Sequence, residues 1–311
     1  MASGEAAGAA PPRALTGNVL ALLSTILWSS AFPATEFLLR SWDPLPLAVA
    51  RLTGAATFIL LLALLAGQGR ELARAPMRDV FFLGGCGVAA SVLLVVIGQL
   101  WTDAVTVGII STTMPLISAL MAWALDGLRP TAPVAVGIVL AIAGGIVATT
   151  DGTGSGAGPR GGEILVLASM VAWIWYSRGA LTRLAGHGDL ALSGLTFAAA
   201  AIVVAGVLAL ALPLGLAEPR FVLDGPNLAA VLWMGMIAIG LSVPLWFTSA
   251  RILGLTVAAI HTNLAPFYVM LIAVGFGGTV SGRQVLGAVL VAAGALLAQL
   301  AHRWKLRPDG A

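Results

Sequence analysis

Long apolar stretches, separated by short polar breaks, constrain this chain more than any other feature of its sequence. Each stretch runs for about 18 to 25 residues, the length that a helix needs to cross roughly 30 Å of hydrocarbon. Only 9% of the 311 residues are charged, whereas a water-soluble domain carries about 25% charged residues. A soluble globular enzyme conflicts with this composition, and we expect an all-α integral membrane protein.

Charged residues and turn formers divide the chain into ten such stretches. The first five cover about 15–37, 45–66, 80–99, 104–125 and 131–150, and the second five cover about 163–182, 190–214, 228–249, 255–276 and 285–302. The turn between the third and fourth stretches, around Trp101 and Asp103, is the shortest. Because the period-two alternation of barrel strands is absent, the sequence predicts ten transmembrane helices.

Basic residues orient the predicted bundle, since cytoplasmic loops carry an excess of Lys and Arg. With a cytoplasmic N-terminus, eleven basic residues face inward: Arg13, Arg70, Arg74, Arg78, Arg129, Arg178, Arg183, Arg251, Arg303, Lys305 and Arg307. Four face outward: Arg40, Arg160, Arg220 and Arg283. We therefore expect a multi-pass protein of a bacterial inner membrane, with both termini cytoplasmic, a disordered segment at 1–14 and a tail at 304–311.

The two halves of the chain resemble each other. Three sets of residues correspond: Ser24 and Trp28 with Ser169 and Trp173, 145 residues apart; Pro115 with Pro266; and Gly137 and Gly144 with Gly287 and Gly294, 150 residues apart. This order predicts two five-helix repeats, 15–150 and 163–303, joined by a Gly-rich linker at 151–162. An odd number of spans per repeat makes the repeats inverted, which is a recurring design of secondary transporters.

Four segments carry a resemblance to a known family. They are Leu27-Trp-Ser-Ser-Ala-Phe32, Pro46-Leu-Ala-Val-Ala-Arg51, Met114-Pro-Leu-Ile-Ser-Ala-Leu and Ala265-Pro-Phe-Tyr. In this order, over about residues 15–303, the chain resembles the drug/metabolite transporter (DMT) superfamily, specifically its EamA-type branch of ten-helix carriers. The resemblance implies export of amino acids or other metabolites.

One departure from the family pattern limits what can be carried over. The family places a glutamate after a glycine at the ends of helices four and nine, where this chain reads Gly127-Leu-Arg129 and Gly277-Gly-Thr279. Asp126 lies nearby and could replace the first acid in part.

Arg51 is the sharpest polar feature within the predicted spans. Its guanidinium could bind a carboxylate or a phosphate through its forked donors. It could instead be a structural arginine that satisfies backbone carbonyls or extends toward the membrane surface. Its position near the outer end of its span favours the structural interpretation.

Prolines predict open turns in spans four and nine. Pro266 removes one backbone donor, so the helix should kink near His261 and Asn263. Freed carbonyls at membrane depth must face protein or water. The matching turn in span four contains Thr112, Thr113 and Pro115. Both turns could line a substrate pathway, or their polar side chains could simply join neighbouring helices.

Aromatic side chains at mid-span are the other candidates for a binding site, since aromatic faces accept flat apolar groups and attract cations. Ordinary core packing is the alternative interpretation. The complete predicted substrate pathway consists of Trp28, Ser29, Arg51, Gln99, Thr112, Thr113, Pro115, Trp173, Tyr176, Trp246, His261, Asn263, Pro266 and Tyr268.

Small residues recur every four positions in spans five and ten, at Gly137, Ala141 and Gly145 and at Ala288 and Ala292. This spacing permits close contact between helices. The two halves could meet there, or two protomers could, so the sequence leaves a monomer and a homodimer open.

These features favour a secondary carrier for a small metabolite, with an amino acid, in particular an aromatic one, as the leading substrate class. We expect no catalytic residue, metal site, cofactor or nucleic-acid partner; the expected partners are the substrate and the lipid bilayer. The alternatives are a nucleotide-sugar or sugar-phosphate carrier, a multidrug carrier, and a membrane-embedded lipid-modifying enzyme. The span interiors contain no central Asp or Glu, and His261 is the one mid-span histidine, so we expect facilitated diffusion or exchange.

Overall fold

The computed structural model describes residues 11–127, 132–149, 161–215, 219–275 and 279–305. These residues form helices and connecting turns, without a strand in any of the five ranges. The prediction of an all-α protein is therefore confirmed. The remaining residues, which include most of the predicted N-terminal segment and nearly all of the predicted linker, lie outside the described ranges.

The described residues of the first half of the chain form ten elements. They are α1 (Pro11–Ser29), α2 (Ala31–Leu38), α3 (Pro44–Leu65), α4 (Gly69–Arg74), α5 (Met77–Leu83), the π-helix η1 (Gly84–Ala89), α6 (Ala90–Gly98), α7 (Ala104–Ser111), α8 (Met114–Asp126) and α9 (Ala132–Thr149). The first predicted span is thus two helices that break at Ser30. The predicted turn around Trp101 and Asp103 is present between α6 and α7.

In the second half, the part of the chain that the structure describes forms nine elements. They are α10 (Gly162–Arg183), α11 (Asp189–Ala211), α12 (Gly225–Leu232), the π-helix η2 (Trp233–Ile239), α13 (Ser242–Leu253), α14 (Leu255–Ala259), the 3-10 helix η3 (Ile260–Leu264), α15 (Ala265–Gly275) and α16 (Gly282–Lys305). The 3-10 segment ends at Leu264, two residues before Pro266, so the predicted irregularity of span nine is confirmed.

Within the described ranges, seven helical runs are long and apolar enough to cross a membrane: Arg13–Leu38, Pro44–Leu65, Met77–Gly98, Gly162–Arg183, Asp189–Ala211, Gly225–Leu253 and Leu255–Gly275. The pair α7 and α8 would be an eighth, and it bends by 42° at Thr112 and Thr113. Within α9 and α16 the apolar segments are shorter, 135–144 and 282–294. The chain is a multi-pass membrane protein, and the count of ten spans stays a prediction.

Local sequence explains where several of these helices start and end. Asp103 caps α7 by accepting a hydrogen bond from the backbone N–H of Thr106 at 2.9 Å, and Asp224 caps α12 in the same way through Asn227 at 2.8 Å. Pro44 opens α3, where a missing N–H costs nothing. Gly127 ends α8 with φ at 72°, a left-handed conformation that glycine adopts without strain.

Irregular helical segments occur at matching places in the two halves. A π-helix interrupts the third span at η1 and the eighth predicted span at η2. The fourth span breaks between α7 and α8, and the ninth passes through the 3-10 segment η3. Such interruptions are often found at functional sites.

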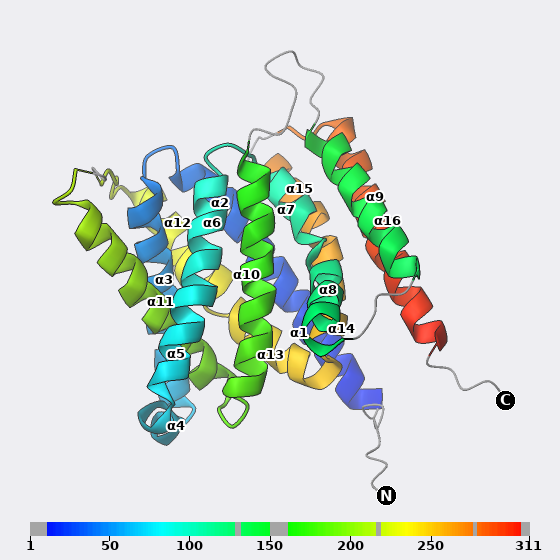
Figure 1. Cartoon of the computed structure of the whole chain (residues 1–311). Helices are drawn as coiled ribbons and strands as arrows, with labels where there is room; N and C mark the ends of the chain where they lie inside the picture. Colours follow the sequence, from blue (N-terminus) through cyan, green and yellow to red (C-terminus); the bar gives the residue numbers. More distant parts are fainter. Residues whose placement is uncertain (1–10, 128–131, 150–160, 216–218, 276–278, 306–311) are drawn as a thin grey trace, which may run out of the picture.

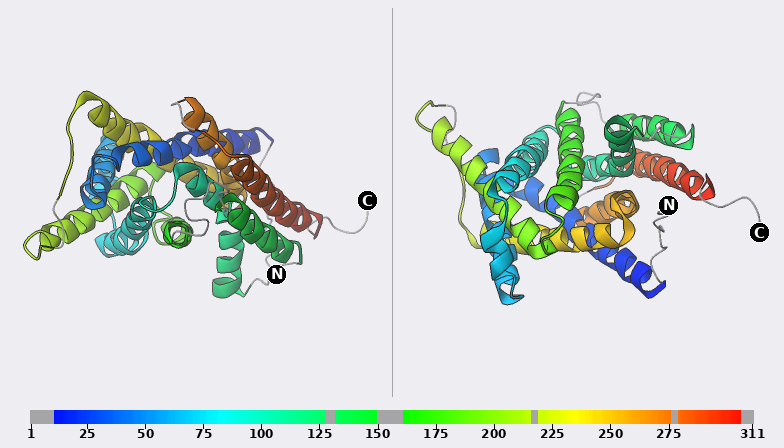
Figure 2. Two further views of the ribbon diagram at one scale, coloured as in Figure 1. Left: turned by 90° about the horizontal axis from the view of Figure 1, so that it is seen from above. Right: turned by 60° about the horizontal axis from the view of Figure 1, so that its bottom comes forward.

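The helices that correspond between the halves also pack against one another. In Figures 1 and 2, α3 lies beside α11 at one end of the molecule, and α9 lies beside α16 at the other. Close contact between α9 and α16 depends on glycine: a methyl group at Gly144 would lie 2.7 Å from the Gly287 carbonyl oxygen, and one at Gly294 would lie 2.9 Å from that of Gly137. The two helices run antiparallel, and the halves of the chain meet there. Of the small residues expected at this contact, the side chains of Ala141 and residue 145 lie outside the described set.

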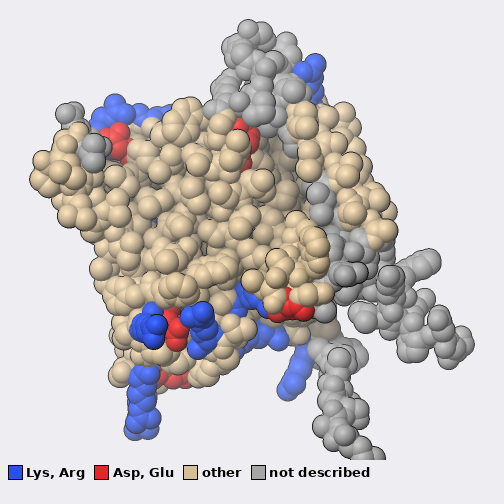
Figure 3. Space-filling model, in the orientation of Figure 1, with Lys and Arg blue, Asp and Glu red and all other residues tan. Residues whose placement is uncertain are grey.

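Charged side chains gather at the two ends of the helices and leave an uncharged band between them on the face shown in Figure 3. At the lower end, three ion pairs join Arg178 to Asp126, Arg183 to Asp79, and Arg251 to Asp189. At the upper end, Arg220 pairs with Asp43 at 3.8 Å. In Figure 1, α1 begins and α16 ends toward the lower side.

Candidate functional site

Two small adjoining pockets lie between the halves, and Trp28, Trp173 and Val243 line both of them. The first pocket has a volume of about 10 Å³ and is also lined by Ser24, Thr25, Met114, Ser242, Trp246 and Thr262. The second has a volume of about 30 Å³ and is also lined by Phe32, Arg51, Ser91, Val92, Val95, Ser169, Met170, Phe197 and Ile239. Because about 10–15 Å³ holds one water molecule, the central space is closed in this conformation, and a metabolite would require its walls to move apart.

Serine hydroxyls build corresponding contacts in the pocket walls. Ser24 Oγ donates to the carbonyl oxygen of Ser242 at 2.8 Å, and Ser169 Oγ donates to that of Ser91 at 2.8 Å. Ser169 is the counterpart of Ser24, and each accepting serine follows a π-helix by two or three residues. The same contact therefore joins α1 to the eighth predicted span and α10 to the third.

Three tryptophans form the apolar walls. The Trp28 ring meets Phe32 edge-on at 4.7 Å between centroids. Trp173 contacts Tyr176 at 5.4 Å and Phe197 at 6.5 Å. Trp246 Nε1 donates to Ser177 Oγ at 3.2 Å, so its polar edge is satisfied while its ring borders the first pocket.

Arg51 lies in α3 with only 4% of its surface exposed, and it borders the second pocket. Its buried Nε has no hydrogen-bond partner, and no hydrogen bond or ion pair joins its guanidinium to any residue that the structure describes. Moving an ion from water into the protein interior costs several kcal/mol, and an ion pair with further hydrogen bonds is needed to offset this cost. The site therefore holds a buried cation whose donors are unoccupied by the described protein groups.

The broken helices contribute fewer pocket residues than the sequence predicts. Met114 and Thr262 line the first pocket. Thr112 and Thr113 instead donate to the carbonyl oxygens of Ile109 and Ile110, both at 2.7 Å. Thr262 Oγ1 donates to Ala259 O at 2.7 Å and lies 3.3 Å from Ser111 O, so it joins the breaks in the two helices.

Several other predicted pathway residues lie outside both pockets. Ser29 donates to Thr25 O, Gln99 donates to Phe32 O, and Tyr176 bonds to Thr196. His261 is half-buried with Nδ1 3.3 Å from Ala258 O. Asn263 is buried, and neither polar atom of its side chain has a partner within the described part of the chain. Pro115 and Pro266 are buried, and Tyr268 is half-buried. The pockets thus unite Trp28, Arg51, Trp173 and Trp246 from the predicted set.

Sequence reasoning missed the small polar residues of the pocket: Ser24, Thr25, Ser91, Ser169, Ser242 and Thr262. Ser24 and Ser169 stood out as a corresponding pair, and their position one turn before the tryptophans was the available signal. No three His, Cys, Asp or Glu side chains converge to hold a metal among the residues in the described ranges.

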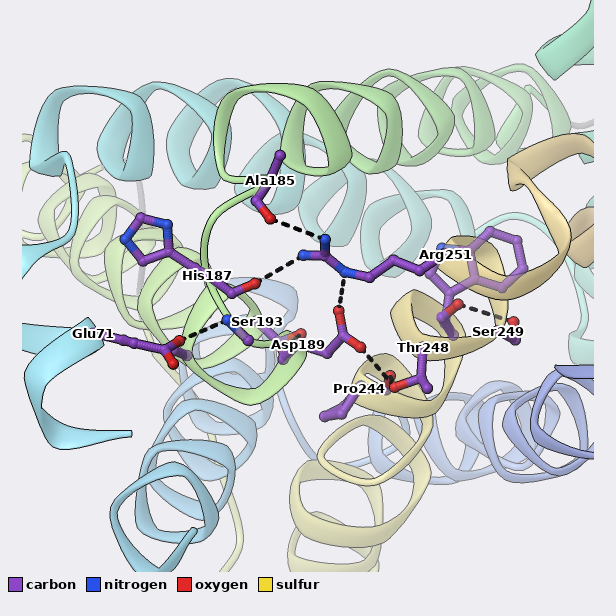
Figure 4. Close-up of polar contacts among 12 residues, drawn as sticks. Glu71, Ala185, His187, Asp189, Ser193, Pro244, Thr248, Ser249 and Arg251 are labelled. Atoms are coloured by element: carbon purple, nitrogen blue, oxygen red, sulfur yellow. Dashed lines mark hydrogen bonds and ion pairs between the residues drawn. The ribbon is translucent and has the colours of Figure 1, made fainter. Parts of the chain in front are cut away.

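Hydrogen bonds tie the helices together at the lower end (Figure 4). Arg251 of α13 bonds to Asp189 at 2.6 Å and donates to the carbonyl oxygens of Ala185 and His187 at 3.1 and 2.9 Å. Thr248 donates to the same Asp189 carboxylate at 2.7 Å. The end of α13 is therefore fastened to the loop between α10 and α11.

Other contacts fasten the upper end. Trp42 Nε1 donates to Val222 O at 3.0 Å, and Asp43 accepts from the Arg220 backbone N–H at 2.8 Å. Trp42 is only 5% exposed, because it packs on the segment before α12. The central pockets lie between the two fastened ends.

Apolar helices whose two halves enclose a small central pocket are typical of a membrane transporter. Residues 15–150 and residues 160–300 each match the EamA-like transporter family, so the chain belongs to that family, which is of the drug/metabolite transporter type.

Two known proteins are similar over most of the chain. An uncharacterized transporter of Bacillus subtilis strain 168, YyaM, is 24% identical over 287 residues, which cover 90% of this chain and 92% of YyaM. A protein of known crystal structure shares the fold with a TM-score of 0.69 at 22% identity, over 94% of this chain and 99% of that one.

Proposed function

We propose that this protein is a secondary carrier that exports an amino acid, with aromatic amino acids as the leading candidates. Transport proceeds by alternating access between two inverted five-helix repeats in ten spans. The mode of transport is facilitated diffusion or exchange. The protein lies in a bacterial inner membrane with both termini in the cytoplasm, as monomer or homodimer.

The contacts between corresponding helices carry the proposal of alternating access. Exchange of the two repeats maps the Gly144–Gly287 contact onto the Gly294–Gly137 contact, and the Ser24–Ser242 bond onto the Ser169–Ser91 bond. Contacts that map onto themselves under this exchange fit a closed state between two packings of similar energy, each of which would open the central site to one side of the membrane.

The pocket walls support an amphipathic substrate with a flat apolar part. Trp28, Trp173 and Trp246 present ring surfaces to the pockets. Several buried Lys or Arg residues would suit a sugar phosphate or a nucleotide sugar, whereas Arg51 is the single basic residue among the described residues that line the central pockets. An amino acid fits this combination of aromatic rings and one cation.

The acidic residues near the span ends support transport without proton coupling. Proton-coupled carriers commonly use a membrane-embedded carboxylate, and the described residues that line the two central pockets include no Asp or Glu. Glu36 accepts a hydrogen bond from the backbone N–H of Ala104 at 2.8 Å, and Asp126 pairs with Arg178. Both carboxylates therefore hold helix ends together.

Counterflow into proteoliposomes tests the proposal, with a panel of amino acids, nucleosides, sugar phosphates and lipophilic cations. We expect saturable exchange of amino acids, and Trp28→Ala should abolish it. Trp123→Ala is the matched control, because Trp123 is 48% exposed on α8 and borders neither pocket. Movement of organic cations or phosphates alone would refute the substrate class. Proton flux that accompanies the substrate and disappears in His261→Ala would refute the absence of proton coupling.

A further inference from the structure

We propose that Arg51 is a carboxylate-binding residue. The substrate carries a carboxylate group, and this group occupies the second pocket. The inference rests on the proposed carrier function and names the chemical group that the cavity recognises. It requires a ligand with a free carboxylate at one end and an apolar part at the other.

The first support is the unsatisfied guanidinium. Arg51 is 96% buried (4% exposed) and borders the second pocket, yet no hydrogen bond or ion pair engages it within the described residues. A structural arginine at membrane depth bonds to carbonyl oxygens or to an acid, and such contacts are absent around Arg51 in the described part. Arg presents its donors in a fork that matches the two oxygens of a carboxylate.

The second support is the pair of serine side chains that line the pocket together with Arg51. The hydroxyls of Ser91 and Ser169 lie 3.1 Å apart, and Ser169 Oγ already donates to Ser91 O at 2.8 Å. The Ser91 hydroxyl can rotate and donate to an anion instead of to Ser169. Among the residues that the structure describes, no Asp or Glu borders this pocket to compete for the cation.

The third support is the size and shape of the space. The volume of about 30 Å³ suits a carboxylate group, since one water needs about 10–15 Å³. The remainder of a substrate extends past Trp28 and Trp173, which border both pockets, toward Trp246 and Thr262. The carboxylate thus faces α3, and the apolar side chain lies among the tryptophans once these rings separate.

The test compares substrates that differ only at the carboxylate. Proteoliposomes with the full chain are assayed with L-phenylalanine, L-phenylalaninamide and 3-phenylpropionate, together with short aliphatic monocarboxylates. We expect the wild-type KM for the amide to exceed that for phenylalanine at least tenfold. Arg51→Gln should raise the phenylalanine KM at least tenfold and remove the discrimination against the amide, whereas Arg51→Lys should recover part of it. Arg40→Gln is the control, because Arg40 is exposed and borders no central pocket.

A stability measurement separates binding from a structural role. Removal of an unpaired buried charge is expected to leave the thermal unfolding midpoint of Arg51→Met and Arg51→Gln in detergent equal to or above that of the wild type. A lower midpoint, or failure of both variants to fold, would show that Arg51 is structural and would overturn the inference.

The outcomes distinguish the inference from the proposed function. Amino-acid exchange with an unchanged KM in Arg51→Gln would refute the carboxylate site and leave the amino-acid carrier intact. Arg51-dependent movement of aliphatic monocarboxylates without any amino-acid exchange would refute the amino-acid carrier and support the site. Equal KM values for phenylalanine and its amide in the wild type would refute the site.

Discussion

A single methyl group at residue 144 tests the contact between the two halves. In Gly144→Ala the new Cβ would lie 2.6 Å from Val291 Cγ2, 2.7 Å from the Gly287 carbonyl oxygen and 3.0 Å from the Val291 backbone nitrogen. Favourable carbon contacts lie at about 3.5–4.0 Å. Two of the three neighbours are backbone atoms, so a rotamer change cannot relieve the overlap, and α9 and α16 must move apart.

The magnitude follows from a matched control. Overpacking of this kind costs about 1–3 kcal/mol, while Ala gains up to about 1 kcal/mol over Gly in a helix. Gly206→Ala in α11 carries the same helical gain, and a Cβ there would meet nothing within 4 Å. We therefore expect Gly144→Ala to be less stable than Gly206→Ala by about 1–3 kcal/mol.

Reversible unfolding in mixed detergent micelles measures this difference as a free energy of unfolding. Gly294→Ala must behave like Gly144→Ala, because its Cβ would lie 2.7 Å from Leu140 Cβ and 2.9 Å from the Gly137 carbonyl oxygen. Equal stability of Gly144→Ala and Gly206→Ala would refute the close approach of α9 and α16. A large effect at residue 144 alone would refute the correspondence between the two contacts.

Three further predictions concern the ends and the wall of the cavity. Arg251→Ala removes the bonds to Asp189, Ala185 and His187. Thiol labelling of a cysteine introduced at Thr262 should therefore become several-fold faster than in the Arg251→Lys control. An unchanged labelling rate would show that the lower end of the helices does not control access to the pocket. Trp246→Phe leaves the buried Ser177 hydroxyl without its donor and should lower the free energy of unfolding by about 1 kcal/mol, and no loss in the unfolding assay would contradict the bond. Hydrogen bonds from Asn227, first from its backbone N–H, lower the pKa of Asp224. The stability that the Asp224 carboxylate adds is therefore present above the unfolded pKa and is lost as pH falls through the lower folded pKa. Asp224→Ala should lower the unfolding midpoint at neutral pH and have a smaller effect in acid, and an equal effect at both pH values would refute the role of the charged form.

The sequence predicts the helices better than it predicts the cavity, for physical reasons. A continuous apolar stretch in a membrane must form a helix to satisfy its backbone hydrogen bonds, and Pro266 predicts the irregular turn before it. The π-helix η1 gives no comparable signal, because Gly84-Gly-Cys-Gly87 contains no proline and no periodic polar residue.

The pocket residues could be predicted only in part. Trp28, Trp173 and Trp246 are conspicuous at mid-span, but the serines are not, since a serine hydroxyl can always bond to a carbonyl of its own helix. The lack of a partner for Arg51 depends on the side chains that α1, α2, α6, α10, α11, η2 and α13 together bring to the second pocket. Such a property of the tertiary packing leaves no trace in the residues around position 51.

The side chains at corresponding positions near the cavity differ between the two halves. Helices α3 and α11 begin 145 residues apart, at Pro44 and Asp189, so Arg51 corresponds to Thr196. Thr196 bonds at 2.7 Å to the hydroxyl of Tyr176, and Tyr176 corresponds to Ala31. At the positions where the first half has Ala31 and the cation, the second half therefore has a large side chain and its hydrogen bond. Under the proposed alternating access, corresponding backbones would supply two equivalent packings, whereas the unmatched arginine places the proposed anion site in the first half alone. The substrate would then keep one orientation, with its anionic end toward α3, whichever side of the membrane the cavity faces.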